Sequence, residues 1–191
     1  FKALSLGPPA TVLATGPPVN PETTPRSINV RYEFPARRDL PPLTLTWRHG
    51  AKPAVLATHV DPADWRWGVL FVGSRGMLLA DLFHWKLLPE SQFRDHPSAK
   101  WPKRKGEEQG RYEEWDAGDH YREWITACKT GSPTACSFDY GGALTEMVLL
   151  GNVSYRAGTQ LEWDATSLIP KNCPTEAEHY INPPYRQGWT L

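Results

Sequence analysis

The sequence predicts an α+β fold, an open and mainly antiparallel β-sheet with helices packed on one face. Residues Ser27–Phe34 alternate apolar and polar side chains, which is the period of a sheet with one covered face. The two clearest helical patterns, His120–Lys129 and Gly142–Arg156, follow the strand-like segments in the chain. Strands that come first and helices that come later, without a βαβ rhythm, predict α+β rather than a parallel sheet.

The remaining elements follow from local patterns in chain order. Phe1–Pro9 is typical of a helix end, with Gly7 as the left-handed stop, so we interpret residues 1–7 as the remnant of a truncated helix. Glycines at 73 and 76 predict a hairpin between two apolar runs. The other predicted strands are Ala10–Thr15, Leu43–Arg48, Gly68–Gly73, Met77–Leu82, Trp85–Leu88 and Gln160–Trp163.

The predicted helices have identifiable ends and core faces. Asp119 is the expected N-cap of the first helix, and Gly131 and Gly158 are the expected stops of the two helices. A short helix is expected over Thr175–Ile181, and Pro89–Gly118 is expected to be a long surface excursion. The residues expected to face the core from the second helix are Leu144, Met147, Val148, Leu150 and Val153.

Composition limits the classes of function. The chain has 191 residues, so one domain spanning 1–191 is expected. Lysine plus arginine and aspartate plus glutamate number 21 each, which disfavours binding to nucleic acid or to an anionic membrane. No apolar run approaches the roughly 18 to 20 residues that span a bilayer. Three cysteines without a CxxC spacing predict neither a disulfide framework nor a zinc knuckle, although a Cys128–Cys136 bridge stays open.

One segment has the composition of a sugar pocket. Residues 61–67 combine two tryptophans, carboxylates and an arginine, which can stack on a sugar face and hydrogen-bond its hydroxyls. The competing interpretation is a loop anchored by packed tryptophans. The predicted substrate-binding residues are Asp64, Trp65, Arg66 and Trp67.

The other polar clusters have simpler structural interpretations. His120 beside Asp119 is a solvated histidine next to a cap rather than a catalytic group. The charged tip at 37–39 could reach a partner subunit, but a solvated turn is the favoured interpretation. The basic cluster at 100–105 is followed at once by Glu107 and Glu108, which favours a solvated loop. The histidines lack a ligand-like spacing, so no metal site is predicted.

Several separated blocks, in order, resemble the C-terminal domain of the bacterial type of the Gfo/Idh/MocA family of NAD(P)-dependent sugar and polyol oxidoreductases. The helix-to-strand block Cys136–Asp164 carries the resemblance most strongly. The other blocks are residues 2–9, 19–25, 68–81 and 120–131. The resemblance implies an open sheet that contributes to a sugar or polyol pocket and forms a homo-oligomer through its exposed face.

The resemblance also implies which parts of the enzyme lie elsewhere. In the family, a Rossmann domain with a glycine-rich turn binds NAD or NADP, and no GxGxxG occurs in this sequence. The family's catalytic lysine and histidine would precede Phe1, so no catalytic, cofactor-binding or metal-binding residue is assigned here. We therefore expect a substrate-side and oligomerisation domain that needs an N-terminal Rossmann domain and is inactive in isolation.

Two alternatives remain at this stage. One is a stand-alone carbohydrate-binding or self-association module, and the other is a proteolytic remnant of a longer enzyme. The resemblance suggests a bacterial protein, either cytoplasmic or exported to the periplasm, and leaves the substrate and the choice between NAD and NADP open.

Overall fold

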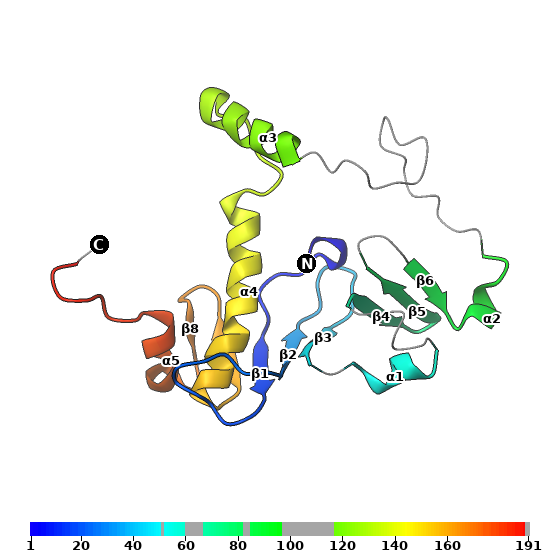
Figure 1. Ribbon diagram of the computed structural model, residues 1–191, viewed down its shortest axis with the longest axis horizontal. Coiled ribbons are helices and arrows are strands. Elements are labelled where there is room, and N and C mark those ends of the chain that lie inside the picture. Colours follow the sequence, from blue (N-terminus) through cyan, green and yellow to red (C-terminus); the bar gives the residue numbers. More distant parts are fainter. Residues whose placement is uncertain (51, 60–66, 82–84, 97–116, 190–191) are drawn as a thin grey trace. The chain divides into compact units, whose positions relative to one another are not determined.

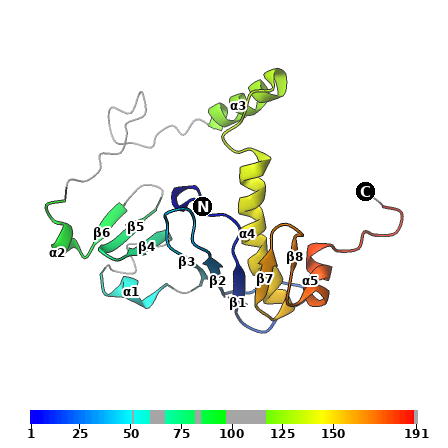
Figure 2. The same cartoon turned by 180° about the vertical axis from the view of Figure 1, so that it is seen from behind.

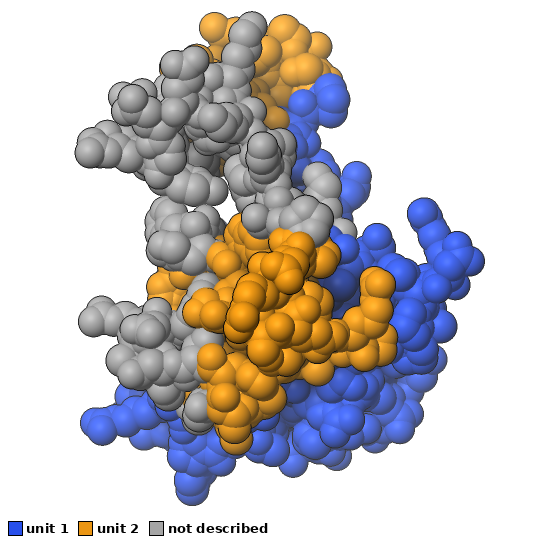
Figure 3. All heavy atoms as spheres, turned by 90° about the vertical axis from the view of Figure 1, so that its right-hand side faces the viewer, with its two compact units in different colours: residues 1–51, 133–191 blue, residues 52–132 orange. Residues whose placement is uncertain are grey.

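The computed structural model describes residues 1–50, 52–59, 67–81, 85–96 and 117–189. These residues form two compact units, shown in different colours in Figure 3. Unit 1 comprises Phe1–Ala51 and Pro133–Leu191, and unit 2 comprises Lys52–Ser132. The α+β class is confirmed, with helices and antiparallel sheets in the described part of the chain. A single domain spanning the chain stays a prediction.

Unit 1 is built on a five-stranded antiparallel sheet of order β3-β2-β1-β7-β8 (Figure 1). Sequence neighbours pair in β3-β2-β1, whereas β7 returns from the far end of the chain to pair with β1. The unit is therefore closed by a contact between distant segments. The strands are β1 (Thr11–Thr15), β2 (Ile28–Phe34), β3 (Leu43–His49), β7 (Leu161–Asp164) and β8 (Ile169–Pro170).

The predicted alternation of β2 is confirmed, because Val30, Tyr32 and Phe34 are buried. On β3, Trp47 lies opposite Val30 and so belongs to the same face of the sheet. Its side chain is nevertheless 58% exposed, unlike its buried neighbour on β2. Burial of this face of the sheet therefore does not extend to Trp47 on the edge strand β3.

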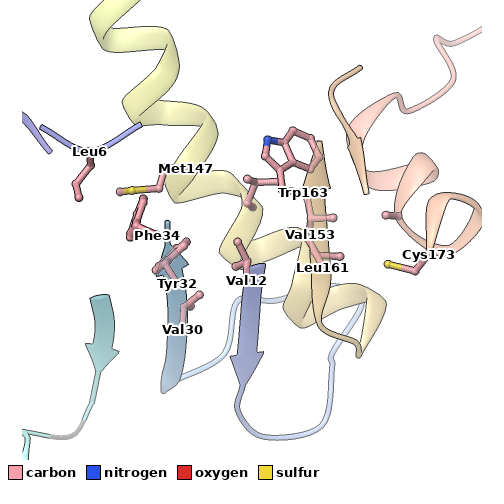
Figure 4. Packing of buried hydrophobic residues seen from close by; sticks show 12 residues of the cluster. Leu6, Val12, Val30, Tyr32, Phe34, Met147, Val153, Leu161, Trp163 and Cys173 are labelled. Carbon is pink, nitrogen blue, oxygen red and sulfur yellow. The ribbon is translucent and has the colours of Figure 1, made fainter. Parts of the chain in front are cut away.

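Helix α4 (Phe138–Ala157) covers this face and packs against β1. Its buried side chains Met147, Leu150 and Val153 meet the strand residues in one cluster, part of which is drawn in Figure 4. The prediction for Val148 was wrong, because that side chain is 52% exposed. The covered stripe of α4 is narrower than its apolar pattern, so the pattern overestimates the core.

A glycine sets the distance between α4 and the sheet. A Cβ atom at Gly151 would lie 2.7 Å from Tyr32 Oη and 3.1 Å from the Val30 methyl groups. Any side chain at this position would push the helix from β2. Since core packing is dense, Gly151 is what lets the helix backbone lie directly on the strand.

Two side chains from the end of α4 fasten it to the first strand and its turn. Buried Ser154 accepts a hydrogen bond from the Ala14 amide over 2.9 Å and donates one to Thr159 O over 2.7 Å. Tyr155 donates to Pro17 O over 2.8 Å. The bonds to Ala14 and Pro17 join residues 140 and 138 positions apart in the chain.

The helix ends agree with the sequence in part. Gly158 caps α4 at φ 67° and Gly131 follows α3 (Ala117–Thr130) at φ 71°, as predicted. The expected N-cap role of Asp119 was wrong, because α3 begins two residues earlier. Helix α5 (Pro174–Ile181) closely matches the expected short helix, and it contacts both β8 and α4 (Figure 2).

The N-terminal segment packs into unit 1. A single 3-10 turn, η1 (Lys2–Leu4), stands where the helix end was expected. The left-handed residue is Ser5 at φ 49°, so the stop assigned to Gly7 was wrong. Phe1 stacks edge-on against Tyr140 with ring centroids 6.0 Å apart, and Leu6 is buried. The segment thus contributes to the core rather than trailing in solvent.

Unit 2 contains a second sheet, of order β4-β5-β6. Its hairpin closes where the sequence predicted, with Gly73 paired to Gly76. A small core of Leu56, Leu79 and Leu88 lies in this unit. The strands therefore divide between two sheets, which the local patterns did not show. The elements are α1 (Ala54–Ala57), β4 (Val69–Gly73), β5 (Gly76–Ala80), β6 (Trp85–Leu88), α2 (Glu90–Phe93) and the helix α3 given above.

Candidate functional site: the open face of the five-stranded sheet

The face of the five-stranded sheet opposite α4 is polar and exposes side chains from three adjacent strands. Register places Leu13, Arg31 and Thr46 in one row across β1, β2 and β3. Because side chains alternate along a strand, the residues two positions away belong to the same face. The flanking rows are Thr11, Glu33 and Thr44 on one side, and Thr15, Asn29 and Arg48 on the other.

A shallow hollow of about 320 Å³ lies on this face. Two arginines and three threonines are among its seven lining residues. The lining residues are Leu13, Thr15, Asn29, Arg31, Thr44, Thr46 and Arg48.

One carboxylate network orders one end of the face. Thr44 Oγ1 donates to Glu33 Oε2 over 2.7 Å, and Arg31 forms an ion pair with the other carboxylate oxygen. The Thr44 hydrogen bond lowers the pKa of the Glu33 carboxyl, and Arg31 lowers it further. Glu33 is therefore a fixed anion at neutral pH and not a proton-transfer group.

At the other end of the face, some polar atoms have no hydrogen-bond partner among the described residues. Arg48 has no hydrogen-bond or ion-pair partner among the described residues, and its strand neighbour Asn29 has a buried Oδ1 that accepts no hydrogen bond. Leaving a buried acceptor unpaired costs about 1 to 3 kcal/mol. The face thus carries a fixed anion at one end and unused polar capacity at the other.

The described residues of this face present hydroxyl, guanidinium, amide and carboxylate groups. Among the described residues that line the hollow, histidine, cysteine and carboxylate side chains are absent. Among all the described residues, groups of three or more histidine, cysteine or carboxylate side chains that could hold a metal ion are also absent. No helix in the described part of the chain is long and apolar enough to cross a membrane.

The structure places few of the predicted substrate-binding residues. Asp64, Trp65 and Arg66 lie outside the described residues. Trp67 is described and its side chain is exposed, two residues before the start of β4 in unit 2. The sugar pocket predicted at residues 64–67 therefore stays a prediction.

Arg37 has a structural role that its sequence context did not reveal. Its Nε donates to Leu4 O over 3.2 Å, and its Nη1 donates to Pro35 O and Pro41 O over 3.2 and 3.1 Å. These bonds hold the β2–β3 connection against the N-terminal turn. The guanidinium is committed within unit 1, which disfavours the alternative that it reaches for a partner subunit.

Other sequence candidates are also ordinary surface groups. His120 is exposed on α3, and the histidine was not assigned a catalytic role. Cys128, Cys136 and Cys173 are free thiols, so the bridge left open by the sequence is not formed. Burial raises the pKa of the Cys173 thiol, which keeps that group protonated and unreactive at neutral pH.

The residues of the open face were visible in the sequence as the polar phase of β2. Asn29, Arg31 and Glu33 alternate with the buried residues, and Thr44, Thr46 and Arg48 do the same on β3. Their combination into rows depends on strand register, which the sequence does not give. No protein-family model matches this chain, and no curated protein matches it.

Proposed function

We propose that this chain is the C-terminal, substrate-binding and oligomerisation domain of an NAD(P)-dependent sugar or polyol oxidoreductase. The observation that carries the proposal is the resemblance of several ordered blocks to that domain of the Gfo/Idh/MocA family, above all Cys136–Asp164. The structure is compatible with it, because this block forms α4 and β7, which both contact β1 in the centre of an open antiparallel sheet.

The chemistry of the reaction would then require a second domain. Hydride transfer needs a bound nicotinamide and a general acid–base group at the substrate hydroxyl. The sequence contains no glycine-rich dinucleotide turn, and the family motifs for the catalytic lysine and histidine have no counterpart in it. The chain by itself is expected to turn over no sugar or polyol.

The gene supplies the most direct test of this proposal. We expect the reading frame upstream of the codon for Phe1 to encode a Rossmann domain with a GxGxxG turn and a lysine motif. The product of that longer frame is expected to reduce NAD or NADP with a sugar or polyol, whereas residues 1–191 alone are expected to bind neither cofactor in calorimetry. Stoichiometric NAD(H) binding by the 191-residue chain would contradict the proposal.

Assembly of a homo-oligomer through the open sheet face is part of the same proposal. The face has charges of opposite sign at its two ends, Glu33 at one and Arg48 at the other. In a two-fold symmetric interface both copies use the same surface, and the two ends of that surface can face each other. Arg48 of one copy can therefore meet Glu33 of the second. Light scattering should show at least a dimer at high protein concentration, and a monomer there would refute this part.

A second candidate is a stand-alone carbohydrate-binding or self-association module. Exposed tryptophans outside both hydrophobic cores favour it, among them Trp47, Trp67 and Trp85. Binding to a glycan array by the 191-residue chain, together with an upstream frame that lacks a Rossmann domain, would support this candidate over the first.

A further inference from the structure

A groove of about 540 Å³ lies in unit 2 along β6 and α2. Figure 1 labels this strand and this helix, which are joined at Pro89. β6 is an edge strand of its sheet, so the groove is lined from one side by the strand and from the other by the helix and the residues that follow it. Its volume lies in the range of small-ligand sites, roughly 300 to 1,000 Å³.

Aromatic side chains form one part of the lining. Trp85 is 38% exposed, and Phe93 and His96 meet edge to face with ring centroids 6.1 Å apart. An exposed indole face is the surface on which the C–H groups of a pyranose pack. The groove therefore offers an apolar platform beside polar groups.

Two contacts fix the helical side of the groove to the sheet. Phe93 lies against Gly76, since a Cβ atom on that glycine would be 2.5 Å from its ring. Gln92 Nε2 donates to Arg75 O over 3.0 Å. Helix α2 is thus held by the β4–β5 turn, and the groove does not depend on the short helix standing alone.

The charges of the lining have a net positive excess. Lys86 Nζ and Glu90 Oε1 form an ion pair at 2.6 Å and neutralise one another. Arg94 is exposed and has no ion-pair or hydrogen-bond partner among the described residues. One unpaired guanidinium matches a ligand with a single negative charge, which a planar carboxylate provides in bidentate geometry.

We propose that this groove binds an acidic sugar, a uronate whose apolar face stacks on Trp85 and whose carboxylate pairs with Arg94. The Lys86–Glu90 pair supplies a donor and an acceptor for ring hydroxyls. The choice of a sugar, rather than another amphipathic anion, rests on the proposed function. A sugar phosphate shares the anionic chemistry, but its charge of about −2 at neutral pH exceeds the one unpaired cation.

The test is titration calorimetry of the 191-residue chain with glucuronate, glucose 6-phosphate and glucose. Glucuronate should bind most tightly, and its affinity should fall as salt is raised. Trp85→Ala should weaken it about tenfold or more. Arg94→Gln should lower the affinity for glucuronate by about tenfold and leave the affinity for glucose unchanged.

Trp189 and Arg186 provide a matched control, because they form an exposed tryptophan–arginine pair with the guanidinium 4.7 Å from the ring centroid in unit 1. Trp189→Ala and Arg186→Gln should leave glucuronate binding unchanged. If Trp85→Ala fails to fold, the indole N–H resonance of Trp85 in the wild-type chain should still shift on titration with glucuronate.

Absence of glucuronate binding, equal affinity for glucose, tighter binding of glucose 6-phosphate, or an unchanged affinity in Arg94→Gln would each overturn the inference. Its failure can be told from that of the proposed function. If an upstream Rossmann domain is found but no sugar binds at the groove, only the inference about the groove is contradicted. If glucuronate binds at Trp85 but no upstream Rossmann domain exists, the oxidoreductase proposal is contradicted and the inference about the groove is supported.

Discussion

The two faces of the five-stranded sheet differ in almost every physical property. Below α4, Val12, Val30 and Tyr32 are buried in a continuous apolar cluster. On the other face, their immediate neighbours Leu13, Arg31 and Glu33 meet solvent or one another. The covered face therefore supplies the hydrophobic core of unit 1, whereas the open face carries polar side chains.

The largest expected difference between the faces comes from two leucines. Leu161 on β7 is 0% exposed under α4, whereas Leu13 on β1 is 37% exposed on the open face. Leu161→Ala should lower the free energy of unfolding by about 2 to 5 kcal/mol, because it leaves a cavity. Leu13→Ala should change it by less than about 0.5 kcal/mol.

Chemical denaturation at protein concentrations low enough to keep the chain monomeric measures both values. Equal losses of unfolding free energy in the two variants would show that the open face is part of the folding core.

The second prediction concerns Ser154, a polar residue of α4 that is buried. Ser154→Ala removes the acceptor of the Ala14 amide and leaves that donor unpaired next to the core. The unfolding free energy should fall by about 1 to 3 kcal/mol. Ser154→Thr, which keeps the hydroxyl, separates loss of the bond from a change of volume; a fully stable alanine variant would show that the bond is dispensable.

The third prediction has the opposite sign and concerns the open face. Asn29→Val removes the buried Oδ1 that has no partner and places a β-branched residue near the start of β2. The monomer should become more stable by about 1 kcal/mol. A destabilised variant in thermal melts would mean that Asn29 serves folding, and the functional interpretation of its polar group would lose its support.

The smallest expected effects are on titration, and adjacent residues should shift in opposite directions. Burial raises the pKa of Tyr32 to about 12 from 10.0. The phenol contributes stability that is fully present below its unfolded pKa and is lost as pH rises through about 12. An absorbance titration should therefore show a late phenol that disappears in Tyr32→Phe.

Glu33 should behave in the reverse way. Because the pKa of its carboxyl is lowered, its contribution is present above the unfolded pKa and is lost as pH falls through the folded one. Thr44→Val should raise the pKa of Glu33 toward its ordinary value, as followed by carboxyl NMR shifts. An unchanged Glu33 pKa in that variant would remove the hydrogen bond from the account of the face.

The sequence predicted the parts of this comparison that depend on local period. The alternation of β2 identified Val30, Tyr32 and Phe34 as core residues, and glycine placed the ends of α3 and α4. The period of a helix indicates a direction but not how wide the covered stripe is. For that reason Val148 was assigned to the core and is exposed.

Properties that depend on distant pairing were not predictable. The division of the strands into two sheets and the return of β7 to β1 are set by contacts across most of the chain. β8 has two residues, too few for any pattern. The rows of the open face need the register of three strands, and the groove at Trp85 needs α2 to fold back over β6, so neither could be read from spacing.

The most direct test of the central claim, that the open face is where a second copy docks, is sedimentation of the wild-type chain beside Leu13→Glu. Glutamate at this position lies opposite Arg31 and should leave the fold intact. We predict a wild-type dimer or larger oligomer and an association constant reduced at least about tenfold in the variant. The melting temperatures of the two proteins should be equal at concentrations low enough to keep both monomeric. A wild-type monomer, or equal association of both proteins, would contradict the account.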